Sequence, residues 1–312
     1  MNPQETTIGI CGIGQMGASS AVAFQRAGYR VLLWARDETK LRAVEAELAR
    51  QSAWSNDHIG PAKRDGGQII LEPNLARLDQ ESDVVLDCIL EVMDFKTTLF
   101  RQFDDAKKRG ALFLSATSGL SITEMGRGGE CEALLVGAHF WNPPHLIPVV
   151  EMIAGEDTPA DRLEAACALM EDIEKIPVRC KDVPGFIGNR IMHAMWREAA
   201  ALVDAGVCTA EEVDKVVKLT FALRLPALGP MENMDLVGLD AAERVQKYLL
   251  PDLANNTVPS ACLSEKVAAG ELGMKSGKGF YDWTKRDPKQ LIENRDSQIA
   301  RQVQFLKEIG EI

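Results

Sequence analysis

Residues 7–17 read TIGICGIGQMG, and this segment decides the fold of the first part of the chain. A short apolar run, Thr7 to Cys11, leads into three glycines spaced Gly-x-Gly-x-x-Gly, and an apolar helical pattern, Ala18 to Ala27, follows at once. This order predicts a strand, a tight turn and a helix. The first glycine permits the turn, the second lets a pyrophosphate approach the backbone, and the third lets the helix pack on the strand.

The same segment predicts a binding site for a dinucleotide. The phosphates would lie at the helix N-terminus, where free backbone N–H groups and the helix dipole attract anions. A glycine pattern alone is weak evidence, but here it stands between a strand and a helix, as the fingerprint requires. The expected contacts with the cofactor are Gly12, Ile13, Gly14, Gln15, Met16 and Gly17.

Apolar runs and helical patterns alternate up to about residue 181. The expected strands are 7–11, 30–34, 83–90, 111–115 and 134–138, with 151–154 and 178–180 extending the same sheet. Strands that alternate with helices are typical of a parallel, doubly wound sheet of the Rossmann type. We therefore expect an α/β domain over residues 1–182.

From Pro184 onward the pattern is helical, with apolar residues every three or four positions over 186–205, 210–220 and 235–249. Asp182 followed by Val183-Pro184-Gly185 favours a helix start, because proline suits the first turn and an acid before it favours the helix dipole. An all-α domain is therefore expected over residues 183–312, ending in a charged, solvated helix over 287–312. Large apolar side chains on these helices predict a homodimer through this half; the residues are Phe186, Met195, Trp196 and Phe221.

Composition excludes several classes of partner. The net charge of −11 opposes non-specific binding to nucleic acid and to anionic membranes. No run of 18 apolar residues occurs, and the first residues lack a secretory pattern. The seven cysteines are scattered, without a Cys-x-x-Cys pair or metal-like His/Cys spacing. We expect a cytoplasmic protein with reduced thiols, no metal and a small-molecule substrate.

The end of the second expected strand bears on the choice between NAD and NADP. An acid at this place binds the ribose 2′-hydroxyl of NAD, whereas an arginine accommodates the 2′-phosphate of NADP. Here Ala35 stands where the acid is expected, with Arg36 and Asp37 after it. Arg36 modestly favours NADP, although a solvated surface arginine is an equal alternative and Asp37 could take the role of the acid.

A candidate acid–base pair lies in two later apolar runs. His139 follows the run 134–138, and Glu151 lies in the run 149–154. If the two strands are neighbours, the carboxylate can hold the imidazole in one tautomer and leave it a general base. A histidine beside aromatic residues is more often structural, so this pair gains weight only from the dinucleotide site before it.

Seven ordered blocks make the chain resemble the L-3-hydroxyacyl-CoA dehydrogenase family over nearly its whole length. They are GICGIGQMG, ILEVMDFK, LSATSGLSIT, GAHFWNPPHLIPVVEMIAGE, DVPGFIGNR, GPMENMDLVGLD and GMKSGKGFYDW. The resemblance implies His139 as general acid or base, Glu151 as its orienting partner, and Ser118 and Asn189 as groups that bind the substrate oxygen. It also implies cofactor contacts from Glu91, Lys96, Ser118, Asn142 and Lys275.

These roles also make chemical sense. When hydride leaves a carbinol carbon, a base must remove the hydroxyl proton and nearby donors must stabilise the developing oxyanion. Ser118 lies just past an expected strand, and Asn189 lies early in the first helix of the second half. The alternatives are a helix cap near Ser121 for Ser118 and a structural interdomain bond for Asn189.

Three departures from the family pattern concern the substrate. Ala116 replaces the usual asparagine, Trp141 replaces the usual second phenylalanine, and the segment before Asp83 is short with few lysines. In the family that segment forms an arm that holds coenzyme A. The blocks TSG and HFWNPPHLIP are more similar to family members that act on small free hydroxy compounds, including carnitine and pyridoxine-degradation dehydrogenases.

The leading hypothesis is an NAD(P)-dependent oxidoreductase that transfers hydride to or from the alcohol of a small hydroxy carboxylate of the 3-hydroxy acid type. The enzyme alternative is a short-chain 3-hydroxyacyl-CoA dehydrogenase acting on 3-hydroxybutyryl-CoA. An alternative of another class is a crystallin-like or cofactor-binding protein without turnover. All four of His139, Glu151, Ser118 and Asn189 are present, and a protein without turnover has no chemical need for the whole set.

Overall fold

The computed structural model describes all 312 residues, which form two compact units. The first unit contains residues 1–190 and 296–312, and the second contains residues 191–295. The division by sequence at residue 182 instead assigns the whole C-terminal segment to the helical part. The difference arises because the last helix packs, along its second half, on the first unit.

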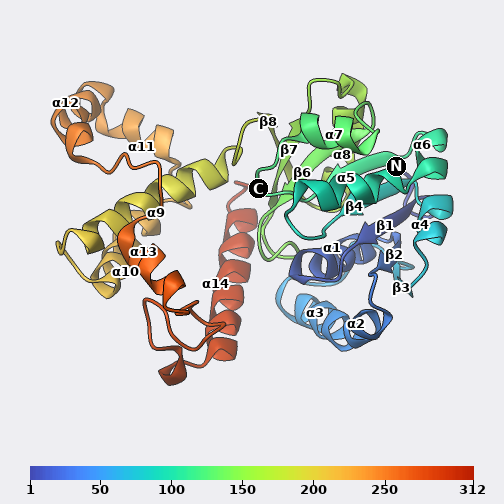
Figure 1. The fold of residues 1–312 in the computed structure, drawn as a ribbon, viewed down its shortest axis with the longest axis horizontal. Helices are drawn as coiled ribbons and strands as arrows, with labels where there is room; N and C mark the ends of the chain where they lie inside the picture. Colours follow the sequence, from blue (N-terminus) through green and yellow to red (C-terminus); the bar gives the residue numbers. More distant parts are fainter. The chain divides into compact units, whose positions relative to one another are not determined.

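The first unit is built on one sheet of eight strands, in the order β3-β2-β1-β4-β5-β6-β7-β8 (Figure 1). The strands are β1 (Thr7–Cys11), β2 (Arg30–Trp34), β3 (Gln68–Glu72), β4 (Val84–Asp87), β5 (Leu112–Ser115), β6 (Leu135–Phe140), β7 (Val149–Ala154) and β8 (Ile176–Lys181). All neighbours pair in parallel except β6 and β7, which are antiparallel. This confirms the Rossmann-type sheet. The edge strand β3 was not predicted from the sequence.

Helices cover both faces of the sheet and enclose two separate cores. The helices of the first unit are α1 (Gln15–Arg26), α2 (Glu38–Ala43), α3 (Glu45–His58), α4 (Leu75–Glu81), α5 (Met93–Arg101), α6 (Asp104–Arg109), α7 (Ile122–Gly129) and α8 (Ala160–Asp172). Along β1, Ile8 and Ile10 face the core beneath α1, α3 and α8, whereas Cys11 belongs to the core beneath α4 to α7. The strands are therefore apolar along almost their whole length, because a parallel sheet is buried on both of its faces.

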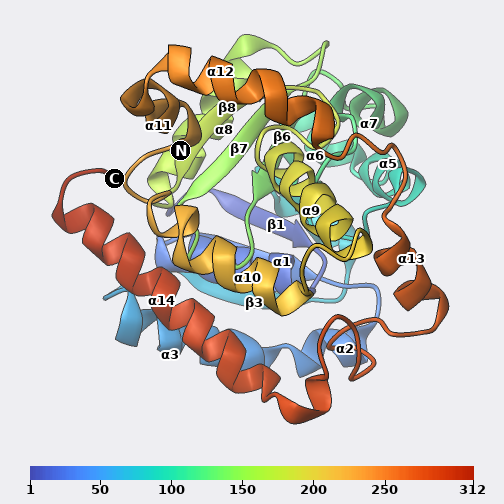
Figure 2. The same ribbon diagram turned by 90° about the vertical axis from the view of Figure 1, so that its left-hand side faces the viewer.

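The second unit is helical, as the sequence predicts (Figure 2). Its elements are α9 (Gly188–Asp204), whose first three residues belong to the first unit, then α10 (Ala210–Leu219), η1 (Phe221–Leu223), α11 (Pro230–Val237), α12 (Leu239–Leu249), η2 (Leu250–Asp252), α13 (Ala261–Ala268), η3 (Trp283–Lys285) and the start of α14 (Pro288–Glu308). No residue between 191 and 295 is buried. None of the helices in the structure is both long enough and apolar enough to cross a membrane.

The second half of α14 lies beside α3 (Figure 2). A small cavity of about 60 Å³ between them is lined by His58 and Ile59, by Leu146, and by Ala300, Val303, Gln304 and Lys307. Ala300 is buried in this contact, and Ile299, Val303 and Leu306 are half-buried, whereas most of the remaining residues of 296–312 are exposed. A helix that sequence alone indicated as solvated therefore has one packed stripe.

Candidate active site

The glycine segment forms the cradle that the sequence predicts. Gly12 has φ +115°, and a Cβ there would lie 2.6 Å from the carbonyl oxygen of Cys88. A Cβ on Gly17 would lie 1.9 Å from the carbonyl oxygen of Gly12, so the helix packs directly on the turn. Gly14 has nothing within 4 Å of such an atom, and it precedes α1 without a side-chain cap. The open amides at the start of α1 therefore fit a pyrophosphate.

The other residues of this segment support the cradle. Ile13 and Met16 pack against the core, whereas Gln15 is exposed beside Gly14. The Gln15 side chain accepts a hydrogen bond from Asn142 Nδ2 at 3.4 Å. Two predicted cofactor contacts that lie 127 residues apart are thus neighbours. The cradle lies where the sheet order reverses, between β1 and β4, which is where open α/β sheets bind ligands.

At the end of β2, Ala35 is buried and Arg36 is exposed. Asp37 caps α2, because its carboxylate accepts a hydrogen bond from Lys40 N at 3.1 Å. Its carboxylate is therefore engaged with the backbone, whereas the Arg36 guanidinium makes no hydrogen bond or ion pair within the chain. The Arg36 side chain is therefore unpaired, whereas one oxygen of Asp37 is engaged at the start of α2.

His139 and Glu151 form a buried pair on neighbouring strands. They are direct partners in the antiparallel register of β6 and β7, and His139 Nδ1 lies 2.6 Å from Glu151 Oε2. His139 is only 4% exposed and Glu151 only 3%. A carboxylate beside Nδ1 favours the tautomer with the proton on that atom. Nε2 is then left with a lone pair and can take a proton from a substrate.

The second oxygen of Glu151 is held by the backbone at the start of α9. Oε1 accepts hydrogen bonds from Ile187 N at 2.9 Å and from Gly188 N at 3.0 Å. Burial opposes the charge on Glu151, but the hydrogen bonds from His139 and these two amides outweigh it and lower the pKa of Glu151. Glu151 is therefore ionised, and hydrogen bonds hold both of its carboxylate oxygens in place.

Two aromatic rings border the imidazole. The Trp141 ring centroid lies 5.1 Å from that of His139, and the Phe186 centroid lies at 5.7 Å. Phe186 is 1% exposed, so the expectation that it forms part of an exposed apolar face was wrong. It precedes α9 with φ +50°, a conformation that bulky residues rarely adopt, and its ring is held against the histidine. The sequence contained no signal for this role.

Ser118 and Asn189 are brought together by a direct hydrogen bond. Asn189 Nδ2 donates to the carbonyl oxygen of Ser118 at 2.7 Å, which leaves its second N–H available. The Ser118 hydroxyl makes no hydrogen bond within the chain, and Ser121 rather than Ser118 caps α7. Both side chains thus retain a free donor, which is the requirement for binding a substrate oxygen.

A buried ionic network lies beneath Ser118. Lys96 is 1% exposed and donates to Asp87 Oδ2 at 2.8 Å, and Glu91 Oε2 lies 3.4 Å from its ammonium. Glu91 Oε1 in turn accepts from Thr117 Oγ1 and from Ser118 N, both at 2.6 Å. Burial opposes the charge of Lys96, but Asp87 and Glu91 outweigh it, so its pKa is raised. Glu91 therefore fixes the Ser118 backbone, and Lys96 supports Glu91 from beneath the surface.

Asp87 and Thr117 were not predicted from the sequence, although an acidic residue inside the apolar run 83–90 was a signal for Asp87. Lys275, the remaining expected cofactor contact, lies in the second unit on an exposed turn between Gly273 and Gly277. In the structure, no three or more His, Cys, Asp or Glu residues gather in a way that could hold a metal ion.

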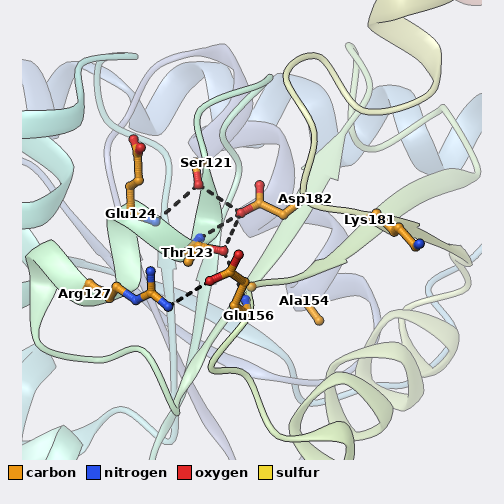
Figure 3. Close-up of a pocket in the computed structure, with 9 residues that line it drawn as sticks. Ser121, Thr123, Glu124, Arg127, Ala154, Glu156, Lys181 and Asp182 are labelled. Atoms are coloured by element: carbon orange, nitrogen blue, oxygen red, sulfur yellow. Dashed lines mark hydrogen bonds and ion pairs between the residues drawn. The ribbon is translucent and has the colours of Figure 1, made fainter.

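A larger cavity, of about 440 Å³, lies elsewhere in the first unit (Figure 3). It includes Ala154, which pairs with Val136 near the start of β6 and so lies at the opposite end of these strands from His139. Its charged groups are mostly engaged, since Arg127 binds Glu156 at 2.9 Å and Asp182 accepts from Ser121 and Thr123. Lys181 points away from that group in Figure 3. This cavity is therefore separate from the buried pair of His139 and Glu151.

A dinucleotide cradle and a histidine–carboxylate pair on one doubly wound sheet define a nicotinamide-dependent dehydrogenase. Comparisons agree with this class: residues 7–183 match the 3-hydroxyacyl-CoA dehydrogenase NAD-binding domain, and residues 185–283 match the 3-hydroxyacyl-CoA dehydrogenase C-terminal domain. The chain belongs to the 3-hydroxyacyl-CoA dehydrogenase family and is an oxidoreductase that acts on a hydroxyl group.

Similar proteins differ in their substrates. The chain is 31% identical over 298 residues to 5-formyl-3-hydroxy-2-methylpyridine 4-carboxylate 5-dehydrogenase of Mesorhizobium japonicum, covering 94% of this chain and 96% of that protein. A crystal structure of a dehydrogenase for this compound, described as an NAD⁺-dependent dismutase, has a TM-score of 0.92 at 30% identity and covers 96% and 98% of the two chains. The structure of (S)-3-hydroxybutyryl-CoA dehydrogenase from Ralstonia eutropha has a TM-score of 0.70 at 28% identity, covering 89% and 98%.

Proposed function

We propose that the substrate is a small, free hydroxy carboxylate, or the matching carbonyl compound, and that it is not linked to coenzyme A. The similar protein from Mesorhizobium japonicum, named for a pyridine carboxylate, supports this class of substrate. The retained set of His139, Glu151, Ser118 and Asn189 supports turnover at this site rather than a binding protein derived from an enzyme.

The observation that carries the proposal is the charge state of residues 38–67, which lead from the start of α2 to β3. The five lysines and arginines of this segment all have acidic partners. The ion pairs are Lys40–Asp37, Arg42–Glu38, Arg50–Glu47, Lys63–Asp172 and Arg64–Asp172. Sites for coenzyme A usually supply cations to its phosphates. Here each cation would first have to leave a carboxylate, and the net charge of −11 offers no general compensation.

The chain's own residues divide the work as follows. Nε2 of His139 removes the proton of the substrate hydroxyl, while Glu151 stabilises the imidazolium that forms. The Ser118 hydroxyl and the free N–H of Asn189 donate to the oxygen as it gains charge, which is the usual source of electrostatic stabilisation in such steps. When bound, the nicotinamide cofactor supplies the hydride acceptor or donor. The glycine cradle, Asn142 and Glu91 would hold it.

Comparing a thioester with free acids tests this directly. The substrates would be 3-hydroxybutyryl-CoA, 3-hydroxybutyrate, carnitine and a hydroxymethyl-pyridine carboxylate, each with NAD and with NADP. We expect at least one free acid to reach a kcat/KM of about 10⁴ M⁻¹s⁻¹ and the thioester to fall well below it. If the thioester reaches that range while the free acids are inert, the enzyme is a short-chain 3-hydroxyacyl-CoA dehydrogenase and the proposal is wrong.

We further propose that the cofactor site accepts NADP as well as NAD, with a preference for NADP through Arg36. The free guanidinium of Arg36 and the engagement of Asp37 as a helix cap support this choice. An arginine at this place can bind the 2′-phosphate, and no free acid is left there to bind the 2′-hydroxyl of NAD.

We also propose that the protein is a homodimer through residues 191–295. This region exposes large apolar side chains, among them Leu223 at 68% and Leu236 at 71%, and buries none. Apolar surface on this scale marks an interface in soluble proteins. Light scattering at micromolar concentration should give about twice the chain mass of 34.2 kDa. Leu223→Glu with Leu236→Glu should shift it to a monomer, whereas Lys247→Glu on the same unit should not; a wild-type monomer would contradict the proposal.

A cytoplasmic location is proposed because all seven cysteines are free, as a reducing compartment would keep them. Fractionation of the source cells would test it. Recovery of the protein from an extracellular or periplasmic fraction would contradict it.

A further inference from the structure

We propose that Trp141 and Gly188 are a matched pair that sets the size limit of the substrate beside His139. The inference rests on the proposed function, since it explains how the site selects a compact substrate. A substrate whose proton goes to Nε2 of His139 must lie against the residues that border that ring. Trp141 and Phe186 are those borders, at centroid distances of 5.1 and 5.7 Å.

The indole occupies the space that a side chain at position 188 would need. A Cβ on Gly188 would lie 2.2 Å from Trp141 Cζ2, 2.9 Å from Cη2 and 3.1 Å from Cε2. All three atoms belong to the six-membered ring of the indole. The contact is with a rigid aromatic ring and not with the end of a flexible chain, so it cannot be relieved by a small adjustment.

Nothing else in the structure requires a glycine at this position. Gly188 is the first residue of α9, and its φ is not in the left-handed region that favours glycine. Its amide donates to Glu151 Oε1, but any residue except proline would supply that bond. Alanine would also favour the helix, because glycine loses more conformational freedom on folding. The glycine is therefore explained by its lack of a Cβ, which leaves room for the Trp141 ring.

The pair has a consequence for substrate selection. The indole lies between His139 and the first turn of α9, so its flat, rigid ring borders the space beside the imidazole. A compact substrate, above all one with a ring that can lie against the indole, fits such a wall. A substrate that carries a long chain at the reacting end competes with the indole for the same space. A smaller ring at position 141 should relax this limit.

A double-mutant cycle on the full-length protein tests the pair. The variants are Trp141→Phe, Gly188→Ala and their combination, with Trp54→Phe as the matched control on α3. For each, kcat and KM are measured with the best free hydroxy acid and with 3-hydroxybutyryl-CoA, together with NAD affinity and the melting temperature. These last two readouts separate a change at the substrate wall from a general loss of structure.

Trp141→Phe should raise the thioester-to-free-acid ratio of kcat/KM by at least about tenfold, the scale on which pocket size discriminates substrates. Gly188→Ala alone should lower kcat/KM at least about tenfold, because the new methyl group displaces the indole, while NAD affinity and melting temperature stay near wild type. The combination should return to the level of Trp141→Phe alone. Trp54→Phe should leave all these values unchanged.

Additive effects of Trp141→Phe and Gly188→Ala would overturn the pairing, as would a ratio that moves no more than in Trp54→Phe. These outcomes differ from a failure of the proposed function. If wild-type protein turns over only the thioester, the proposed substrate class is wrong, and the coupling between the two positions can still be measured with that substrate. If wild-type protein prefers a free acid and the coupling is absent, the substrate class stands and this inference fails.

Discussion

The two units of this chain differ in how far they bury their apolar side chains. Residues 1–190 bury two cores, one on each face of the sheet, with Ile8, Phe24 and Phe113 fully inaccessible. Residues 191–295 bury none, although Leu236 and Met231 lie on well-formed helices. Because apolar burial is the main favourable term in folding, the first unit contains the cores that stabilise it, and the exposed apolar side chains of the second fit the homodimer that we propose.

The two units also differ in the functions that their residues are suited to. The acid–base pair lies on two interior strands, and the glycine cradle follows a third, in a sheet that is packed on both faces. Their geometry is therefore fixed within the single chain. The helical unit offers surface, and its exposed apolar residues are suited to assembly.

If catalysis belongs to the first unit, His139→Asn should reduce turnover by about 10²–10⁴-fold, because the general base is lost. Glu151→Gln should have a similar effect, because a neutral amide does not hold the imidazole in the same tautomer. NAD affinity should stay near wild type in both, since neither residue belongs to the glycine cradle. Steady-state kinetics and cofactor titration check this, with His58→Asn as a control. Near-normal turnover in either variant would show that the pair is structural.

If the first unit derives its stability from buried interactions, Asp87→Asn should lower the free energy of unfolding by about 3–5 kcal/mol, because it leaves Lys96 buried without its main partner. Asp87→Leu combined with Lys96→Met should recover part of that loss. Arg244→Ala removes an exposed ion pair with Asp240 in the helical unit and should change stability by no more than about 1 kcal/mol. Urea unfolding measures all three. Equal losses from Asp87→Asn and Arg244→Ala would contradict the contrast between the units.

Arg36→Asp should shift the NADP-to-NAD ratio of kcat/KM by at least about tenfold toward NAD. A charged hydrogen bond to phosphate contributes roughly 1.5–3 kcal/mol, and tenfold corresponds to about 1.4 kcal/mol. The measurement is kcat/KM with each cofactor, and Lys40→Asp, one turn further along the surface, is the matched control. An unchanged ratio would assign NAD alone and leave Arg36 as a solvated surface residue.

The smallest effect concerns Asp172, which fastens the segment before β3 to the end of α8. Its carboxylate accepts from Arg64 at 2.7 and 2.8 Å and from Tyr29 at 2.7 Å. The bond from Arg64, with that from Tyr29, outweighs burial and lowers the pKa of Asp172 to about 2.

Because the folded pKa lies below the unfolded value of about 3.9, this contribution is full above pH ~4 and is lost as the pH falls toward 2. Asp172→Asn should cost about 1 kcal/mol at pH 7 and only a small part of that at pH 2, and 0.5 M salt should reduce the difference. Thermal unfolding across this pH range measures it. A difference between wild type and Asp172→Asn that does not change with pH would contradict the assignment.

A site residue could be predicted from the sequence when its role depends only on its neighbours along the chain. The glycines at 12, 14 and 17 were predicted because their turn, cradle and helix are contiguous in sequence. The pairing of His139 with Glu151 was conditional on two strands being neighbours, which the register of β6 and β7 supplies. Phe186 was misjudged because a phenylalanine before a helix looks the same whether it faces solvent or a buried imidazole.

Apart from the edge strand β3, the sequence by itself determined the order of the strands, the dinucleotide fingerprint and the family, because these follow from periodicity and from motifs that are local along the chain. Only the tertiary structure decided which charges are available. It engages Asp37 as a cap, buries Lys96 on Asp87 and pairs every cation between residues 38 and 67 with an acid, whereas it leaves Arg36 unpaired. It also fits the indole of Trp141 against Gly188, 47 positions later. The physical reason is that charge pairing and close packing depend on distances in space, and distant parts of the chain set those distances.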